Sequence, residues 1–517
     1  MLNAYPDTRW CAMRFRFEFI DQKAREDATA TGSAQNEVSQ LLQVTDGIIK
    51  QTAPYIALDH NRWGLGHSFS PLPDVIADAQ TGWITDALSG EDCTFSSDPY
   101  LQFDFTEPHS SIGFTIHFEE GTGCHATRLR MQVYDAAGLC VTDEELENHS
   151  AVCVINKLSP DYQRVRFTFH ELSRPLARLR IAEVLFGIVE EYTPDTIKEA
   201  TLNYEVDPTA EALPSREAIV KIDNSSQRFN LINPAGVYAY LQQPQAFQIS
   251  LGIGDSKDTI EYSFMGEFYF VTASAEDSGL TAEIAAYDWF YWMDSSTFKD
   301  SSSGEWTLSE AVQAILTSAG ISCTVVMDAS AAETKLRHVT EAMTHREALR
   351  LAVQASCCTA YFDRDSRLVI TNLTAEMPTD TLTSNNMETP PKVSMESAVN
   401  TVQLTTHDDA TDEDVVFIAS NILRDEMPQS KAVTNPMVTP ENGPTVARWL
   451  LSALQNRLTY STKERGNPET KLGDTVKIYD YFGANRNAVI TKQKYIYSGG
   501  LKAESEMIRN GSADSDI

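Results

Sequence analysis

Two glycine-containing stretches have residue types that could carry out chemistry, and each departs from the motif it is similar to. Residues 66–70 (GHSFS) have the serine of a hydrolase nucleophile elbow, but Ser70 stands where that motif needs glycine. Residues 252–257 (GIGDSK) have two glycines of a phosphate-binding loop and lack its Gly-Lys-Ser/Thr ending. We therefore expect no serine hydrolase at the first stretch and a hairpin turn at the second.

Histidine, cysteine and acidic residues do not gather at metal-ligand spacings. The ten histidines are scattered, and the acidic stretch 408–414 (DDATDED) departs from the calcium-loop pattern. No Cys-x-x-Cys occurs, so we expect the eight cysteines to be free thiols that pack as small hydrophobic side chains. We predict no catalytic, cofactor-binding or metal-binding residue, although carboxylate spacing alone leaves a glycosidase open.

Tryptophan is the one residue type that offers a binding hypothesis. Trp63 and Trp83 lie in a β-rich N-terminal region, and exposed tryptophans form stacking platforms for sugars. The alternative is that they are buried aromatic core or subunit contacts, as we also expect for the aromatic cluster 287–292. Trp63 and Trp83 are therefore the candidate glycan contacts.

Composition limits the classes of function. The chain has 517 residues, 41 Lys and Arg against 73 Asp and Glu, and a net charge of −32. This acidity argues against binding to nucleic acid or to an anionic membrane surface, since both need a basic face. No apolar run of about 18 residues and no apolar signal core occurs, so we expect a soluble, multidomain protein made in a cytoplasm.

Hydrophobic periodicity predicts a mainly β protein with a few helices. Residues 11–19 alternate as a strand with one buried face, and 55–189 contain short β runs spaced as in a sandwich or jelly roll. Capping boxes at 307–310 (TLSE) and 344–347 (THRE) open two helices. A further helix follows Pro444, and final strands occupy 475–502.

A series of short motifs between 195 and 505 resembles the tail-hub proteins of tailed phages and prophages of Gram-positive bacteria. The motifs are 215–224 (SREAIVKIDN), 228–230 (RFN), 233–236 (NPAG), 240–242 (YLQ), 265–269 (MGEFY), 285–288 (AAYD), 465–468 (RGNP), 472–474 (LGD) and 497–501 (YSGGL). The helices at 307–319 and 345–357 and the hairpin at 359–371 are similar to the small α/β part of these hubs. Residues 55–190, with 108–113 (PHSSIG), resemble a galactose-binding-like, discoidin-type jelly roll.

The resemblance implies a mainly β fold with two hub β-barrels, a small α/β subdomain between them and an inserted jelly roll. The expected domains are an N-terminal strand and linker helix joining the first hub barrel (1–54), the jelly roll (55–190), the first hub β-barrel (191–304), the α/β subdomain (305–375), the second hub β-barrel with one helix (376–505) and a frayed tail (506–517). Strand 11–19 is expected to complete the first barrel.

The same resemblance implies a structural role at the distal tail tip of a virion assembled in the bacterial cytoplasm. Such hubs form trimers that close the tail tube and join it to tube or distal-tail ring proteins, the tape-measure protein and baseplate or receptor-binding proteins. The acidic balance would suit a lumen through which phage DNA passes in transit. We expect no enzyme and no membrane anchor, because the chain stops about 15 residues after 497–501, where some hubs have a wall-degrading extension. The alternatives are an adhesion module that binds cell-surface glycan and a six-fold distal-tail ring protein.

Overall fold

The computed structural model describes most of the chain, and the statements below concern the described residues. These are residues 9–49, 80–119, 123–227, 229, 245–276, 279–300, 302, 304–339, 341–374, 376–395, 397, 399–408, 413–422, 427, 429–456, 458–479 and 485–509. The chain divides into two compact units, each described by itself. The main unit takes its described residues from 1–16, 191–236 and 246–517, and the sandwich unit takes its own from 17–190 and 237–245.

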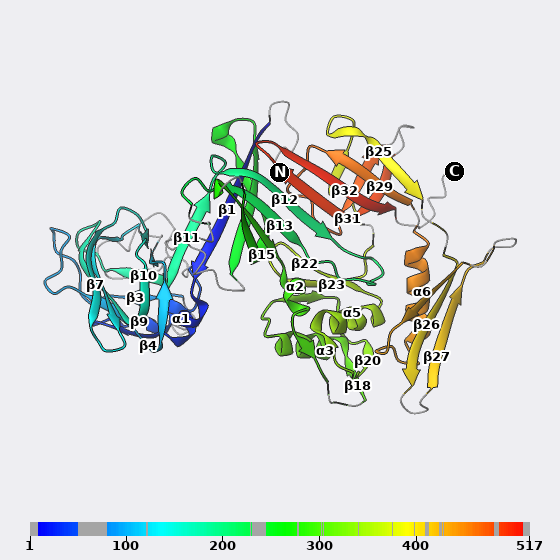
Figure 1. Cartoon of the computed structure of the whole chain (residues 1–517), viewed down its shortest axis with the longest axis horizontal. Coiled ribbons are helices and arrows are strands. Elements are labelled where there is room, and N and C mark those ends of the chain that lie inside the picture. The colour runs from blue at the N-terminus through cyan, green and yellow to red at the C-terminus, as the bar shows by residue number, and fades with distance from the viewer. Residues whose placement is uncertain are drawn as a thin grey trace. The chain divides into compact units, whose positions relative to one another are not determined.

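The sandwich unit consists of two antiparallel sheets that share one hydrophobic core (Figure 1). The first sheet has the order β2 (Thr29–Gly32), β4 (Tyr100–Ser111), β9 (Ser159–Leu172), β6 (Ala126–Asp135), β7 (Cys140–Glu147). The second has the order β3 (Trp83–Ile84), β10 (Arg180–Leu185), β5 (Phe114–Phe118), β8 (Val152–Ile155). In β9 the alternating side chains of Val165, Phe167 and Phe169 are buried, as a strand with one core face requires. The predicted inserted β-sandwich is therefore confirmed.

The sandwich begins earlier in the chain than its strand pattern indicates. Residues 1–54 are expected as a strand and linker of the first barrel, but β2 pairs with β4 inside the sandwich. The helix α1 (Gln22–Asp27) and the short 3₁₀ helix η1 (Leu41–Thr45) belong to the same unit. Ala24 of α1 and Val44 of η1 contribute to the sandwich core, so this segment packs as part of the module that it was expected to lead into.

A 13-stranded sheet dominates the main unit and continues through both predicted barrels. Its order is β11 (Gly187–Tyr192), β1 (Trp10–Ile20), β14 (Ala246–Gly254), β15 (Glu261–Glu276), β16 (Thr281–Tyr287), β13 (Glu217–Asp223), β12 (Ile197–Glu205), β31 (Asn485–Tyr497), β32 (Leu501–Arg509), β29 (Leu458–Glu464), β25 (Met387–Met395). Off this path, β30 (Thr475–Tyr479) pairs with β31, and β24 (Asp380–Leu382) pairs with β30. The two halves join where β12 pairs with β31. A 3₁₀ turn, η4 (Lys257–Thr259), connects β14 and β15, so 252–257 ends in the expected hairpin.

An α/β subdomain covers the middle of the main-unit sequence. Its helices are α2 (Trp289–Met293), α3 (Leu308–Ala319), α4 (Ala329–Ala332) and α5 (His345–Ala355), and its strands are β17 (Thr297–Phe298), β18 (Glu305–Thr307), β19 (Val325–Met327), β20 (Lys335–Arg337), β21 (Met343–Thr344), β22 (Thr359–Phe362) and β23 (Leu368–Thr371). The capping box Thr307–Glu310 is complete, and Gly320 ends α3 in the left-handed conformation at φ 68°. The predicted helices and the β22–β23 hairpin are present.

Residues 401–454 belong with the α/β subdomain rather than with the second barrel in which they were expected. The strands β26 (Thr401–Asp408), β27 (Glu413–Ser420) and β28 (Ser430–Thr434) form a separate sheet, and α6 (Gly443–Leu454) follows them. Leu404 and Val446 lie in one core cluster with Val312 of α3 and Leu349 of α5. None of the helices in the described part of the chain has the length and hydrophobicity that a bilayer-spanning helix needs.

Candidate functional site

Of the two tryptophans proposed as glycan contacts, the structure describes only Trp83. Trp63 lies outside the described residues. Trp83 has no exposed surface and packs near Phe169, with 6.2 Å between ring centroids. Because a fully buried indole presents no face to a sugar, the hypothesis of a glycan contact at Trp83 is wrong, and its alternative as core is what the structure shows. All eight cysteines are described and none forms a disulfide.

A deeply buried ion pair joins two of the hub-like motifs. Arg216 precedes β13, and Asp288 is the N-cap of α2. The Arg216 Nε donates to Asp288 Oδ2 at 3.3 Å, and the two side chains are 2% and 1% exposed. Asp288 Oδ2 also accepts from the Arg216 backbone N–H at 3.0 Å, and Oδ1 accepts from the Phe290 N–H at 3.1 Å.

The surroundings of this pair explain why both charges can be buried. Burial raises the pKa of Asp288, and the Arg216 guanidinium together with the backbone donors opposes that shift. Arg216 Nη2 further donates to the Glu267 carbonyl at 3.2 Å, so one guanidinium contacts both the N-cap of α2 and strand β15. The pair therefore fixes the start of the α/β subdomain to the sheet.

A second buried arginine forms hydrogen bonds with the turn that contains the motif 465–468. Arg364, in the β22–β23 turn, is 7% exposed and donates to the carbonyls of Pro468 and Thr470. The Tyr495 hydroxyl donates to the Asn467 carbonyl at 2.8 Å. Three backbone carbonyls of one turn are thus satisfied by side chains from the hairpin and from β31.

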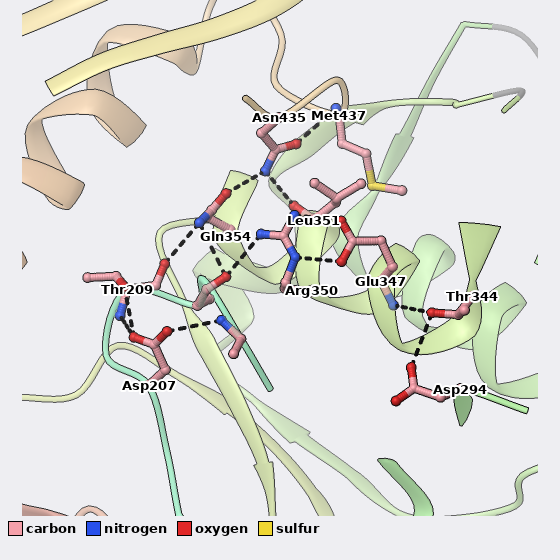
Figure 2. A network of polar contacts seen from close by, with 12 residues as sticks. Asp207, Thr209, Asp294, Thr344, Glu347, Arg350, Leu351, Gln354, Asn435 and Met437 are labelled. Carbon is pink, nitrogen blue, oxygen red and sulfur yellow. Dashed lines mark hydrogen bonds and ion pairs between the residues drawn. The ribbon is translucent and has the colours of Figure 1, made fainter. Parts of the chain in front are cut away.

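A buried polar network joins α5 to the chain segments before and after it (Figure 2). Gln354 Nε2 donates to the carbonyls of Thr209 and Ala210 at 3.0 and 3.2 Å. Asn435 Nδ2 donates to the Leu351 carbonyl at 2.9 Å and to Gln354 Oε1 at 3.1 Å. Gln354 and Asn435 are both fully buried. They connect α5, the β12–β13 segment and the segment after β28.

The N-terminal end of α5 carries the exposed continuation of this network. Thr344 accepts from the Glu347 N–H at 3.2 Å, which is the first half of the predicted capping box. The Glu347 carboxylate instead forms two hydrogen bonds with Arg350, both at 2.7 Å, and Arg350 lowers the pKa of Glu347. Arg350 also donates to the Ala210 carbonyl at 3.3 Å. Figure 2 shows these side chains directed along one path from Asp294 to Asn435.

We predict that Asn435→Ala lowers the free energy of unfolding by about 2–3 kcal/mol, because it leaves the buried Gln354 amide oxygen and the Met437 N–H without their hydrogen-bond partner. Urea unfolding of the full chain measures the change. Asn385→Ala, which alters an exposed asparagine in the same unit, is the matched control and should change stability little. Equal losses in both variants would contradict a structural role for the network.

The buried side chains described above form hydrogen bonds with backbone groups and so hold neighbouring helices and strands together. Among the described residues, no three His, Cys, Asp or Glu side chains gather as a metal site would require. The residues that sequence reasoning missed, such as Gln354, Asn435 and Arg364, carry no local signal. Arg216 and Asp288 were inside named motifs, but their pairing across 72 positions was not predicted.

Comparison with solved structures gives similarities of fold at low identity. A tail protein from Neisseria meningitidis matches with a TM-score of 0.47 at 11% identity, covering 62% of this chain and 94% of that one. A Listeria monocytogenes prophage tail protein matches with a TM-score of 0.42 at 13% identity, covering 63% and 92%. A family 32 carbohydrate-binding module from Clostridium perfringens (C. perfringens NanJ), solved with galactose, matches with a TM-score of 0.22 at 12% identity, covering 34% and 99%.

An Escherichia coli type VI secretion component, described as similar to T4 phage tail proteins gp27 and gp5, matches with a TM-score of 0.38 at 6% identity, covering 61% of this chain and 74% of that one. No protein-family model and no curated protein sequence matches the chain.

Proposed function

We propose that this chain is a structural component of a phage or phage-like tail, a hub that closes the distal end of the tail tube and joins it to the baseplate or host-recognition apparatus. The observation that carries the proposal is the position of the hub-like motif residues. Arg216, Asp288 and the turn 465–468 all lie at buried joints of the main unit. The likeness to tail-hub proteins therefore concerns the residues that fix the architecture.

The proposed mode of action is assembly and opening rather than bond chemistry. A closed oligomer would cover exposed strand edges and apolar side chains such as Ile418 and Met395, which are 65% and 66% exposed. The proposed partners are further copies of this chain, tail-tube or distal-tail ring proteins, the tape-measure protein and receptor-binding proteins. The proposed location is the distal tail tip.

The mass of the purified chain in solution tests this role. Light scattering across a concentration series should give a trimer near three times 57.5 kDa. A hexamer would favour the six-fold distal-tail ring protein instead. A monomer at every concentration would contradict the trimeric hub.

The sandwich unit supports a second candidate function, the adhesion module that binds glycan. Its two-sheet architecture is that of the jelly roll resembled by 108–113. A glycan array with the full chain tests it, with Trp63→Ala as the variant, because Trp83 is buried. Binding that Trp63→Ala leaves unchanged would remove the remaining tryptophan candidate.

A further inference from the structure

The main unit contains one peptide bond between two residues whose combination is chemically labile. Asparagine is a thermolabile residue, because the backbone nitrogen that follows it can attack its side-chain amide. Glycine in the following position hinders this attack least, since it has no side chain. The chain has two Asn-Gly pairs: Asn442–Gly443 at the start of α6, and Asn510–Gly511 outside the described residues.

The asparagine of the first pair uses both ends of its amide group. Asn442 Oδ1 accepts from the Thr439 N–H at 2.9 Å. Asn442 Nδ2 donates to the carbonyls of Lys335 in β20 and Ala355 at the end of α5, at 3.1 and 3.2 Å. Only a group that both accepts and donates can make these three hydrogen bonds, and a carboxylate cannot donate. One amide therefore ties the start of α6 to β20 and α5.

The glycine of the pair is fixed by packing and by its own hydrogen bond. A Cβ at position 443 would collide with the ring of Phe417 in β27, so no larger residue fits. The Gly443 N–H donates to the Thr439 carbonyl at 3.0 Å. To attack the side chain of Asn442, this nitrogen must give up its hydrogen bond, and the Asn442 amide must leave its three partners. The closed joint therefore blocks the reaction of a pair that the fold itself requires.

The pair lies beside a hollow that admits water. The hollow has a volume of about 370 Å³, and Asn442 lines it together with Ala331 of α4 and Ser356 after α5. Asn442 is also partly exposed. The water that would complete the reaction is therefore present at the site, and what limits the reaction is the opening of the joint.

We propose that Asn442–Gly443 is a deamidation site, protected while the joint of α6 with α5 and β20 is closed and reactive when this joint opens. The Gly443 nitrogen forms a bond to Cγ of Asn442. The bond from Cγ to the amide nitrogen breaks, and that nitrogen leaves as ammonia with the proton of the Gly443 N–H. Water then opens the resulting succinimide ring at either carbonyl and gives aspartate or isoaspartate. The proposal is independent of the tail-hub role.

The product of this reaction cannot rebuild the joint. An aspartate at position 442 has no N–H for the carbonyls of Lys335 and Ala355, and its negative charge would face both oxygens. An isoaspartate also inserts an extra atom into the backbone at the start of α6. The modification is therefore one-way, and it records that the joint has opened.

Peptide mass spectrometry of the full chain, incubated in mildly alkaline buffer with and without denaturing urea, tests the site and its protection. In urea the pairs 442–443 and 510–511 should deamidate at similar rates, because no fold distinguishes them. In native buffer the pair 442–443 should react at least about tenfold more slowly than in urea. A pair 442–443 that stays intact in urea while 510–511 reacts would overturn the site. Equal rates at 442–443 with and without urea would overturn the protection.

Asn435→Ala tests the dependence on opening, because Asn435 holds the segment before α6 to Leu351 and Gln354 of α5. If opening admits the reaction, this variant should deamidate at 442–443 about tenfold or more faster than the parent in native buffer and at the same rate in urea. Asn385→Ala, an exposed asparagine of the same unit, is the matched control and should react as the parent does. Equal native rates in Asn435→Ala and the parent would overturn the proposal.

Asn442→Asp makes the aspartate product directly and tests its consequence. Because two carbonyls lose their donor, the urea midpoint of unfolding should fall below that of the parent chain. Asn385→Asp adds the same charge at an exposed position and is the control, whose midpoint should change little. An Asn442→Asp midpoint equal to that of the parent would overturn the inference that deamidation weakens the joint.

Discussion

Asp288→Ala should lower the free energy of unfolding by about 3–5 kcal/mol, the cost of leaving one member of a buried ion pair without its partner. The Arg216 side chain is 2% exposed, so water cannot replace the lost carboxylate. The variant also removes the N-cap of α2 and the acceptor of the Arg216 backbone N–H. Urea or thermal unfolding of the full chain measures the loss.

The double variant Arg216→Met/Asp288→Ala is the matched control. It removes both charges together, so it should recover part of the stability that Asp288→Ala alone loses. The surface pair Lys463–Glu504 gives the contrast, because Glu504→Ala breaks an exposed ion pair and should cost less than about 1 kcal/mol. Similar losses for Asp288→Ala and Glu504→Ala would contradict the account of the buried pair.

The sandwich unit should become less stable as the pH rises from about 4.5 to 8, because of one buried carboxyl group. Glu183 of β10 has no exposed surface, and burial raises its pKa from 4.5 to about 8. The nearby Asp46 raises it further, while a hydrogen bond from the Gly47 N–H at 3.2 Å and the charge of Arg25 act in the opposite direction. At neutral pH the folded unit therefore holds a proton that the unfolded chain releases.

The sign of this effect follows from the direction of the shift. A pKa that is raised in the folded state gives a stabilisation that is complete below pH 4.5 and is lost as the pH rises toward 8. Between pH 4.5 and pH 7 the loss amounts to about 3 kcal/mol for a fully buried group. Hydrogen exchange at β10 and β5, measured at several pH values, reads the local stability of the unit.

Glu183→Gln isolates this contribution from the other titrating groups. The amide keeps the shape and the acceptor for the Gly47 N–H but does not titrate, so the decrease between pH 5 and pH 7 should become smaller by that amount. Glu147→Gln, on the exposed strand β7, is the control and should leave the pH profile unchanged. A Glu183→Gln profile parallel to that of the parent chain would show that Glu183 is not the group responsible.

The features that the sequence alone predicts correctly are those set by local interactions. Strand alternation placed β1, and the Thr307–Glu310 capping box placed α3 with its glycine end. The second box shows the limit, since Glu347 pairs with Arg350 three residues on instead of completing the box. The capping box and the Glu347–Arg350 pair are both local interactions, and the sequence alone does not show which of them forms.

The features that escaped prediction depend on residues far apart in the chain. The pairing of β12 with β31 joins segments nearly 300 positions apart and links the strands of the two expected barrels in one hydrogen-bonded sheet. The side chains of β26 and α6 pack in one core with those of α3 and α5. Local sequence does not predict this contact, because it depends on how distant segments come together in the folded chain. Trp83 has the same local sequence pattern whether it is buried or exposed, and its burial depends on the first sheet of the sandwich, where Phe169 packs near it.

The chain enters the sandwich unit and leaves it again at two neighbouring points. The Asp21 N–H donates to the Phe186 carbonyl at 2.9 Å, and a Cβ at Gly187 would lie 1.9 Å from the Phe19 carbonyl oxygen. Any domain whose own ends lie equally close could occupy this position without altering β1 or β11. Recombination at these two strands would exchange one module for another in a single step, so we expect lineages to differ most between Ile20 and Gly187.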